Sequence, residues 1–174
     1  MDKQKIVKQT VKDRLLHALI EFAGKKDWST LTATELIEKS GVARASFYRN
    51  FKSVEEIIEY GIQEMARCYH GGKTFSEEDF HSREVMLYKF TFYQKYADLI
   101  LAFHRAKVST TLLDVITDCE IEAFGDMPVH SISRYELYFF SGAFYNMMLC
   151  WLESGAKETP EAMADEFLRI VGSR

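Results

Sequence analysis

Helix-breaking residues are scarce along this chain. Its 174 residues contain two prolines, Pro128 and Pro160, and nine glycines. Apolar residues make up 47% of the chain, which is enough to bury a sizeable core and excludes wholesale disorder. Few breakers together with a large apolar fraction favour an all-helical fold over a turn-rich β sandwich.

Capping signals mark where the helices begin. Thr32-Ala-Thr-Glu35 and Ser53-Val-Glu-Glu56 have the spacing of a capping box, in which a hydroxyl and a carboxylate three residues later satisfy backbone amides. Thr159-Pro160-Glu161 combines an N-cap, a proline at the first helical position and an acidic first turn. With the apolar periodicity, these signals predict helices over about residues 7–23, 32–40, 43–50, 53–70, 82–106 (one or two helices), 109–124, 133–153 and 160–171.

The segment from Ser133 to Glu153 is the most apolar of these helices, and Ser133 is its expected N-cap. Apolar side chains lie around most of its circumference, so other helices must cover it on several sides. Ser141, Gly142 and Asn146 interrupt the segment, and it is too short to span a bilayer. Its apolar residues are Leu137, Tyr138, Phe140, Phe144, Tyr145, Met148, Leu149, Trp151 and Leu152.

The N-terminal residues and the cysteines indicate a compartment. The chain opens with charged residues and no apolar stretch follows, so we expect no secretory signal. Cys68, Cys119 and Cys150 are odd in number and far apart, which is typical of reduced thiols and not of a disulfide framework or a zinc site. We therefore expect a cytoplasmic protein that binds no membrane, no metal and no cofactor.

Charge is distributed unevenly along the chain, whose net charge is −4. Residues 1–55 contain eleven Lys and Arg against seven Asp and Glu, whereas residues 56–174 contain eleven against nineteen. A basic N-terminal third on an acidic body is typical of a protein that meets phosphate at one end. Chance clustering of solvated charges would give the same numbers.

Residues 32–51, TATELIEKSGVARASFYRNF, have the pattern of a helix-turn-helix, in which the second helix enters the major groove of DNA. Gly41 permits the sharp turn because glycine tolerates a positive φ. We expect Leu36, Ile37, Val42 and Phe47 to hold the two helices against the first helix. The exposed faces then come from Arg44, Ala45, Ser46, Tyr48, Arg49 and Asn50.

Over residues 8–60 the chain resembles the DNA-binding domain of TetR-family transcriptional regulators. The family pattern appears here as Thr32…Leu36, Ser40-Gly41-Val42, Phe47-Tyr48-Arg49-Asn50-Phe51 and the capped Ser53–Glu56. The resemblance implies that one set of side chains contacts phosphates and another lies nearest the bases. The two sets are Thr32, Ser46, Tyr48 and Lys52 for phosphates, and Thr34, Arg44, Ala45 and Asn50 for bases.

Two departures from the family pattern affect the expected strength of DNA binding, and one of them is Asp27, which stands where the family usually has a glycine after the first helix. The lysine that this family commonly carries just inside its fourth helix is Val54 here, which removes one phosphate contact. Lys52 and the lysines of residues 3–12 are candidates to replace the lost phosphate contact. The alternative for the N-terminal lysines is a frayed, solvated tail that does not contact DNA. Arg44 and Arg49 are both candidate DNA contacts, and the pattern leaves open which of them faces the bases.

Residues 141–167 resemble the last two helices of a TetR subgroup common in Gram-positive bacteria. The shared features are Trp151-Leu152, a following glycine and Thr159-Pro160-Glu161. In this family such helices pair across a two-fold axis, which implies a homodimer, although a buried monomer core explains the apolar pattern equally well. The expected domains are a three-helix DNA-binding domain over residues 1–52 and a helical regulatory and dimerisation domain over residues 53–174.

Aromatic and methionine residues of the C-terminal part have the spacing of a helical core, and they also suit the wall of a cavity for a small-molecule effector. No catalytic motif accompanies them, and no two of the five histidines are four residues apart, so we expect neither an enzyme nor a metal site. The candidate effector-binding residues are Met65, Cys68, Tyr69, Met86, Tyr93, Phe103, His104, Phe144 and Met148.

The function that the sequence favours is a homodimeric repressor. We expect it to bind a pseudo-palindromic operator in double-stranded DNA and to be released by a small molecule or a protein partner. The main alternative is a partner of another regulator that keeps this fold but binds DNA weakly or not at all. A small helical enzyme is a third hypothesis, for which the sequence shows no catalytic constellation.

Overall fold

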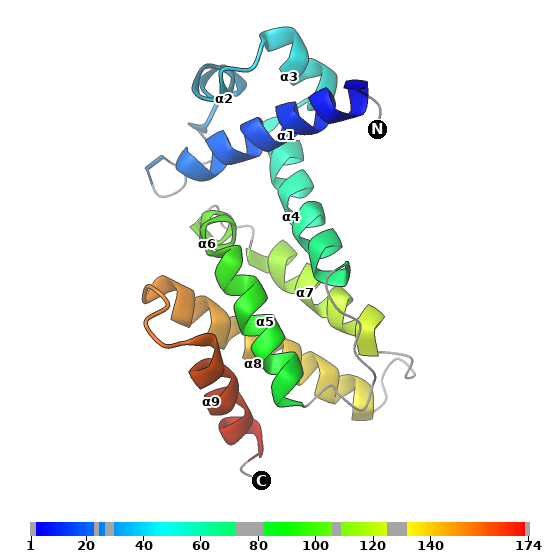
Figure 1. Cartoon of the computed structure of the whole chain (residues 1–174), viewed down its shortest axis with the longest axis vertical. Coiled ribbons are helices and arrows are strands. Elements are labelled where there is room, and N and C mark those ends of the chain that lie inside the picture. Colours follow the sequence, from blue (N-terminus) through cyan, green and yellow to red (C-terminus); the bar gives the residue numbers. More distant parts are fainter. Residues whose placement is uncertain are drawn as a thin grey trace.

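The computed structural model describes residues 3–22, 25–26, 30–71, 82–105, 109–124 and 132–172, and they form nine α-helices (Figure 1). The expected all-α fold is thereby confirmed. The helices are α1 (Lys3–Phe22), α2 (Ala33–Ser40), α3 (Arg44–Asn50), α4 (Val54–His70), α5 (Arg83–Lys95), α6 (Ala97–Arg105), α7 (Ser109–Phe124), α8 (Ile132–Glu153) and α9 (Pro160–Gly172).

Helices α1, α2 and α3 form a small lobe at the N-terminal end of the molecule, the upper part of Figure 1. Leu15 and Leu19 of α1 are fully buried there, together with Leu36 of α2 and Phe47 of α3. Apolar residues four apart on α1 therefore cover the inner faces of two short helices. This is the packing that the apolar pattern of the helix-turn-helix predicts.

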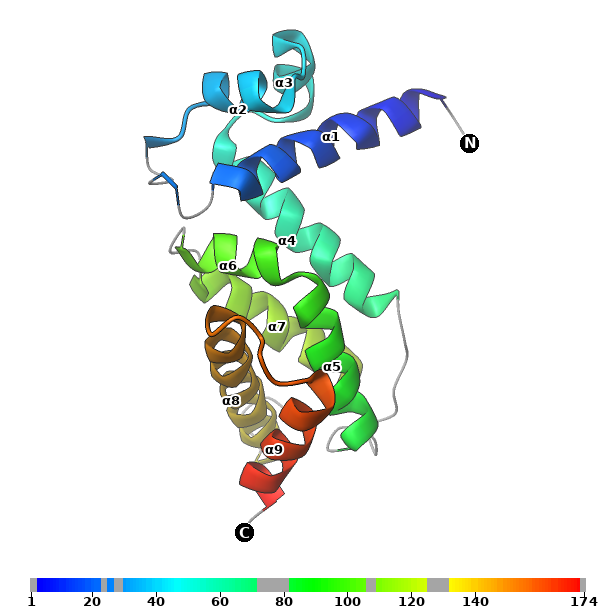
Figure 2. The same cartoon turned by 60° about the vertical axis from the view of Figure 1, so that its left-hand side comes forward.

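Helix α4 leaves this lobe and runs along the helices of the C-terminal body (Figures 1 and 2). In its first half the Tyr60 hydroxyl donates to the Asp13 carboxylate of α1 at 3.1 Å. At its far end the Tyr69 carbonyl accepts from the Tyr88 hydroxyl of α5 at 2.9 Å. The expected domain boundary after residue 52 falls in the turn before α4, and α4 contributes to both cores.

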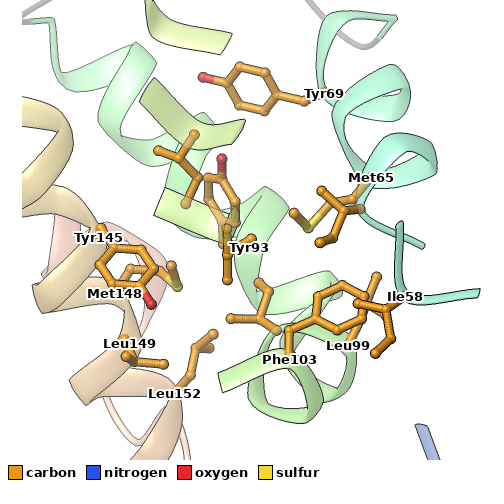
Figure 3. Packing of buried hydrophobic residues seen from close by; sticks show 14 of the residues in the cluster. Ile58, Met65, Tyr69, Tyr93, Leu99, Phe103, Tyr145, Met148, Leu149 and Leu152 are labelled. Atoms are coloured by element: carbon orange, nitrogen blue, oxygen red, sulfur yellow. The ribbon is translucent and has the colours of Figure 1, made fainter. Parts of the chain in front are cut away.

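The C-terminal body consists of α5–α9 and the second half of α4. Helix α5 lies along α9, and α7 lies along α8. Their facing side chains form a continuous apolar core (Figure 3). The labelled members come from α4, α5, α6 and α8: Ile58, Met65, Tyr69, Tyr93, Leu99, Phe103, Tyr145, Met148, Leu149 and Leu152.

Helix α8 differs from the expectation in two respects. It begins at Ile132, so Ser133 lies inside the helix and is not its N-cap. Seven of the nine apolar residues predicted to be covered are buried, but Phe140 is half-buried and Tyr138 is exposed. The other helices of the body cover α8 from one side, and the opposite side of its N-terminal half stays open within the single chain.

Candidate nucleic-acid interface

The start of α2 is fixed by the predicted capping box. The Thr32 hydroxyl accepts from the Glu35 amide at 3.3 Å, and the Glu35 carboxylate accepts from the Thr32 amide at 3.0 Å. Lys26 donates to the same carboxylate at 2.5 Å. This lysine is the largest cause, and the Thr32 hydrogen bonds the next, of a Glu35 pKa lowered to about 2. The carboxylate therefore stays ionised at the N-terminus of α2, where the helix dipole favours a negative charge.

The turn between α2 and α3 is built around Gly41. Its φ is 61°, in the left-handed region that glycine adopts at low cost. Arg14 of α1 donates to the Ser40 carbonyl at 2.5 Å, and a Cβ at Gly41 would lie 2.8 Å from the same guanidinium. The Ser40 hydroxyl, itself buried, accepts from the Val42 amide at 3.3 Å. The turn is therefore fixed both by its own backbone and by α1.

Helix α3 is anchored by one ring. Phe47 is fully buried among α1 and α2, and the exposed Tyr48 ring meets it edge-on with centroids 5.1 Å apart. Because successive helical residues point about 100° apart, burying Phe47 turns its neighbours outward. The helix carries Arg44 and Arg49 and no carboxylate, so its outer face is basic.

Three of the predicted DNA contacts meet on this outer face. Arg44 lies over the Tyr48 ring at 5.3 Å and donates to its hydroxyl at 3.4 Å. The same guanidinium donates to the Thr34 hydroxyl of α2 at 3.5 Å. All three side chains are exposed. Two short helices thus present one surface of a guanidinium, a phenol and a hydroxyl, which are groups that bind phosphate oxygens and base edges.

The other predicted contacts are placed less uniformly. Ala45, Arg49 and Lys52 are exposed like Thr32, whereas Ser46 and Asn50 are half-buried. The Asn50 side-chain amide donates to the Ser46 carbonyl at 2.7 Å, so it is turned onto its own helix. Contact between Asn50 and a base stays a prediction that requires this side chain to rotate.

Two basic residues near this surface have other roles in the fold. The Lys12 ammonium lies 4.6 Å from the Tyr60 ring centroid and 5.5 Å from that of Phe51, so it packs over aromatic rings at the base of the lobe. Arg14 holds the turn, a role that nothing in its local sequence signals because its partner is 26 residues away. Val54, where the family commonly has lysine, is buried.

The predicted effector-binding residues lie mostly in the core. Met65, Tyr69, Met86, Tyr93, Phe103, Phe144 and Met148 are buried, and His104 is half-buried with its ring 3.4 Å from the Glu153 carboxylate. A hollow of about 520 Å³ opens between α4 and α5, and of the nine predicted residues Cys68 alone lines it. A cavity around the other eight stays a prediction.

Comparison with known proteins assigns the family. A TetR-type family model described as "Transcriptional regulator C-terminal region" matches residues 81–173, more than half of the chain. The chain belongs to the TetR family of transcriptional regulators. Membership makes this TetR-family protein a regulator of transcription and not an enzyme. The Gram-positive subgroup indicated by the C-terminal motif stays a prediction.

The fold of this TetR-family regulator has a solved counterpart. The crystal structure of a TetR transcriptional regulator from Streptococcus agalactiae 2603V matches it with a TM-score of 0.61, covering 97% of each chain at 17% sequence identity. At this identity the match shows the shared fold. No curated protein matches the chain significantly.

No helix among the described residues combines the length and apolarity needed to cross a bilayer. Within the same described residues, no group of His, Cys, Asp and Glu side chains could hold a metal ion.

Proposed function

We propose that this TetR-family protein is a homodimeric regulator that binds operator DNA through α3. The observation that carries the proposal is the meeting of Thr34, Arg44 and Tyr48 on one exposed surface. Arg44 suits a guanine edge or a phosphate, and the hydroxyls of Tyr48 and Thr34 suit phosphate oxygens. With Phe47 buried behind them, these groups are held in place before DNA arrives.

A two-fold dimer is supported by the exposed side of α8. Tyr135 and Phe139 are 54% and 53% exposed, and Tyr138 beside them is 43% exposed. Large aromatic residues at positions i, i+3 and i+4 form one stripe on a helix, and an exposed apolar stripe of this kind marks an interaction site. Ile170 of α9 is also exposed. The ring centroids of Phe167 in α9 and Phe140 in α8 are 6.2 Å apart, so the two helices are in contact beside this stripe. We infer that a second copy covers this side of α8 and α9.

The dimer gives the operator its geometry. Two copies related by a two-fold axis would place their α3 helices in successive major grooves, about 34–36 Å apart, which implies a pseudo-palindromic site. We propose that operator binding represses transcription by blocking a promoter. A ligand bound in the C-terminal body would favour a different separation of the two α3 helices and release the DNA.

Operator binding is tested by selecting sequences from random double-stranded DNA with the full-length protein. The affinity of the winning sequence is then measured by fluorescence anisotropy at two salt concentrations. We expect Tyr48→Ala and Arg44→Gln to weaken binding, and the removal of one phosphate contact to reduce the salt slope by about 1. Arg105→Gln, which removes an exposed cation of α6, is the matched control and should leave binding unchanged.

Two outcomes would contradict the proposal. Selection that enriches no sequence would favour the alternative in which the protein acts through another regulator. If a site is enriched but its affinity is unchanged by Tyr48→Ala and Arg44→Gln, the DNA-binding surface lies elsewhere than on α3.

A further inference from the structure

The hollow between the end of α4 and α5 has the size of a small-molecule site. Its volume of about 520 Å³ lies within the usual range of about 300–1,000 Å³ for ligand pockets. It is formed by the last turns of α4 on one side and by two turns of α5 on the other. Predominantly apolar lining with few polar groups is typical of such pockets.

A ladder of aromatic rings lines the α5 side. Tyr88, Phe92 and Tyr96 are four residues apart, so they share one face of the helix. The Phe92 centroid lies 6.2 Å from that of Tyr88 and 4.7 Å from that of Tyr96, with interplanar angles of 30° and 37°. The rings form a continuous surface on which a flat molecule can stack.

The ladder is fixed at both ends by α4. The Tyr88 hydroxyl donates to the Tyr69 carbonyl, and the Tyr96 hydroxyl is hydrogen-bonded to Cys68. The second bond is the largest cause of a Tyr96 pKa raised to about 12. The Tyr96 phenol is therefore neutral at physiological pH, and both outer rings of the ladder are held by α4. A ligand that stacks here has little side-chain ordering to impose, which favours binding.

The rim of the hollow is positively charged. The Nε and Nη2 groups of Arg67 in α4 donate hydrogen bonds to the Glu64 carboxylate at 3.2 and 2.7 Å. The rest of this guanidinium is open to solvent. Lys95 of α5 lies 5.4 Å from the Tyr96 ring centroid and has no carboxylate partner among the described residues. No lining residue carries a negative charge. The two cations come from opposite walls.

We propose that this hollow is a binding site for a small planar aromatic carboxylate. The ring of the ligand stacks on Phe92, and its carboxylate accepts charge-assisted hydrogen bonds from Lys95 or Arg67. An aromatic cation is disfavoured because both charged residues of the lining are cations, and the nearby Glu64 carboxylate is already paired with Arg67. A long alkyl chain fits poorly, since Tyr88 and Tyr96 are only eight residue steps apart, about 12 Å of helix, and one side of the hollow is open to water.

Occupation of this site would reach the DNA-binding lobe through α4. The ligand would bridge α5 to the last turns of α4, whose first turns follow the helix-turn-helix directly. Binding of the ligand depends only on the hollow, whereas its effect on DNA rests on the proposed function. The two are therefore measured separately.

The site is tested by isothermal titration calorimetry of the full-length protein with indole-3-carboxylate, indole, acetate and tryptamine. We expect the carboxylate to bind at least about tenfold more tightly than indole, and acetate and tryptamine not to saturate the protein. Lys95→Gln and Arg67→Gln should each weaken carboxylate binding, and Thr91→Trp should abolish it by filling the hollow. Arg105→Gln again serves as the exposed-cation control.

Equal affinities for indole and its carboxylate would overturn the proposal, as would carboxylate binding that survives Thr91→Trp. Circular dichroism of each variant, compared with wild type, establishes that a loss of binding is not a loss of fold. A second titration follows operator affinity with and without the carboxylate. If the carboxylate binds and operator affinity stays the same, the binding site is supported and its proposed role in DNA release is contradicted. If no operator is found, the calorimetry still decides the site.

Discussion

At the scale of single residues, the buried ion pair of the body is the most demanding interaction. Lys89 of α5 and Glu120 of α7 are 2.7 Å apart, with side chains only 3% and 2% exposed. The Lys89 ammonium also lies 5.6 Å from the centroid of the Phe144 ring. Two charges removed from water cost several kcal/mol each unless they compensate one another. The pair therefore restricts α5 and α7 to one relative position.

Breaking this pair from one side should destabilise the protein strongly. We expect Glu120→Gln to lower the free energy of unfolding by about 3–5 kcal/mol, because it leaves the Lys89 ammonium buried without its counter-charge. The double variant Lys89→Met with Glu120→Leu should lie much closer to wild type. Urea unfolding followed by circular dichroism measures both. A double variant as unstable as the single one would show that lost packing, and not the unpaired charge, causes the effect.

The capping carboxylate of α2 should make stability depend on pH. The pKa of Glu35 in the folded protein is about 2, below its ordinary value of 4.5. The stability it contributes is therefore fully present above about pH 4.5 and is lost as the pH falls toward 2. We expect Glu35→Gln to lower Tm at pH 7 and to differ less from wild type at pH 3. Glu38→Gln is the surface-charge control, and a Tm difference that stays constant between the two pH values would contradict this account.

At the scale of elements, the middle of α4 is where the two lobes meet. Gly61 is buried between α1 and α6, and a Cβ at this position would lie 2.7 Å from Leu16 of α1 and 3.0 Å from Phe103 of α6. Glycine inside a helix costs about 1 kcal/mol relative to alanine. Close approach of three helices explains its presence, since a Cβ here already pushes against Leu16 of α1 and a bulkier side chain also presses on Phe103 of α6.

A size series at this position tests the close approach. Gly61→Ala should stay within about 1 kcal/mol of wild type, because the gain in helix propensity offsets a clash with the mobile end of Leu16. Gly61→Val should lower the free energy of unfolding by about 1–3 kcal/mol through overpacking. Thermal and urea unfolding provide the values. Equal stability of the alanine and valine variants would mean that α1 and α6 have room at this point.

At the scale of the whole molecule, the proposed dimer depends on the open side of α8. We expect Phe139→Glu to convert a dimer into a monomer, because a charge in the centre of an apolar interface leaves a buried, unpaired carboxylate. Light scattering coupled to size-exclusion chromatography measures the mass directly. Tyr48→Ala, which removes an equally exposed ring from α3, is the matched control and should remain a dimer. A wild-type protein that is monomeric at micromolar concentration would contradict the proposed dimer.

Local signals in the sequence determined where helices begin and which residues form the outer face of α3. The capping residues Thr32, Ser53 and Thr159 act within three residues of themselves, and all three cap the helices they predict. The burial of Phe47 and the exposure of Tyr48 follow from helical periodicity alone. These features depend on neighbours along the chain, so a pattern in one sequence is enough to find them.

Tertiary structure alone decided the contacts between helices. The support of the Ser40 carbonyl by Arg14, the pairing of Lys89 with Glu120 and the opening beside Phe92 join elements that are far apart in the sequence. Each depends on the angle and distance at which two helices cross. Many residues set these quantities jointly through side-chain packing, and no local pattern encodes them.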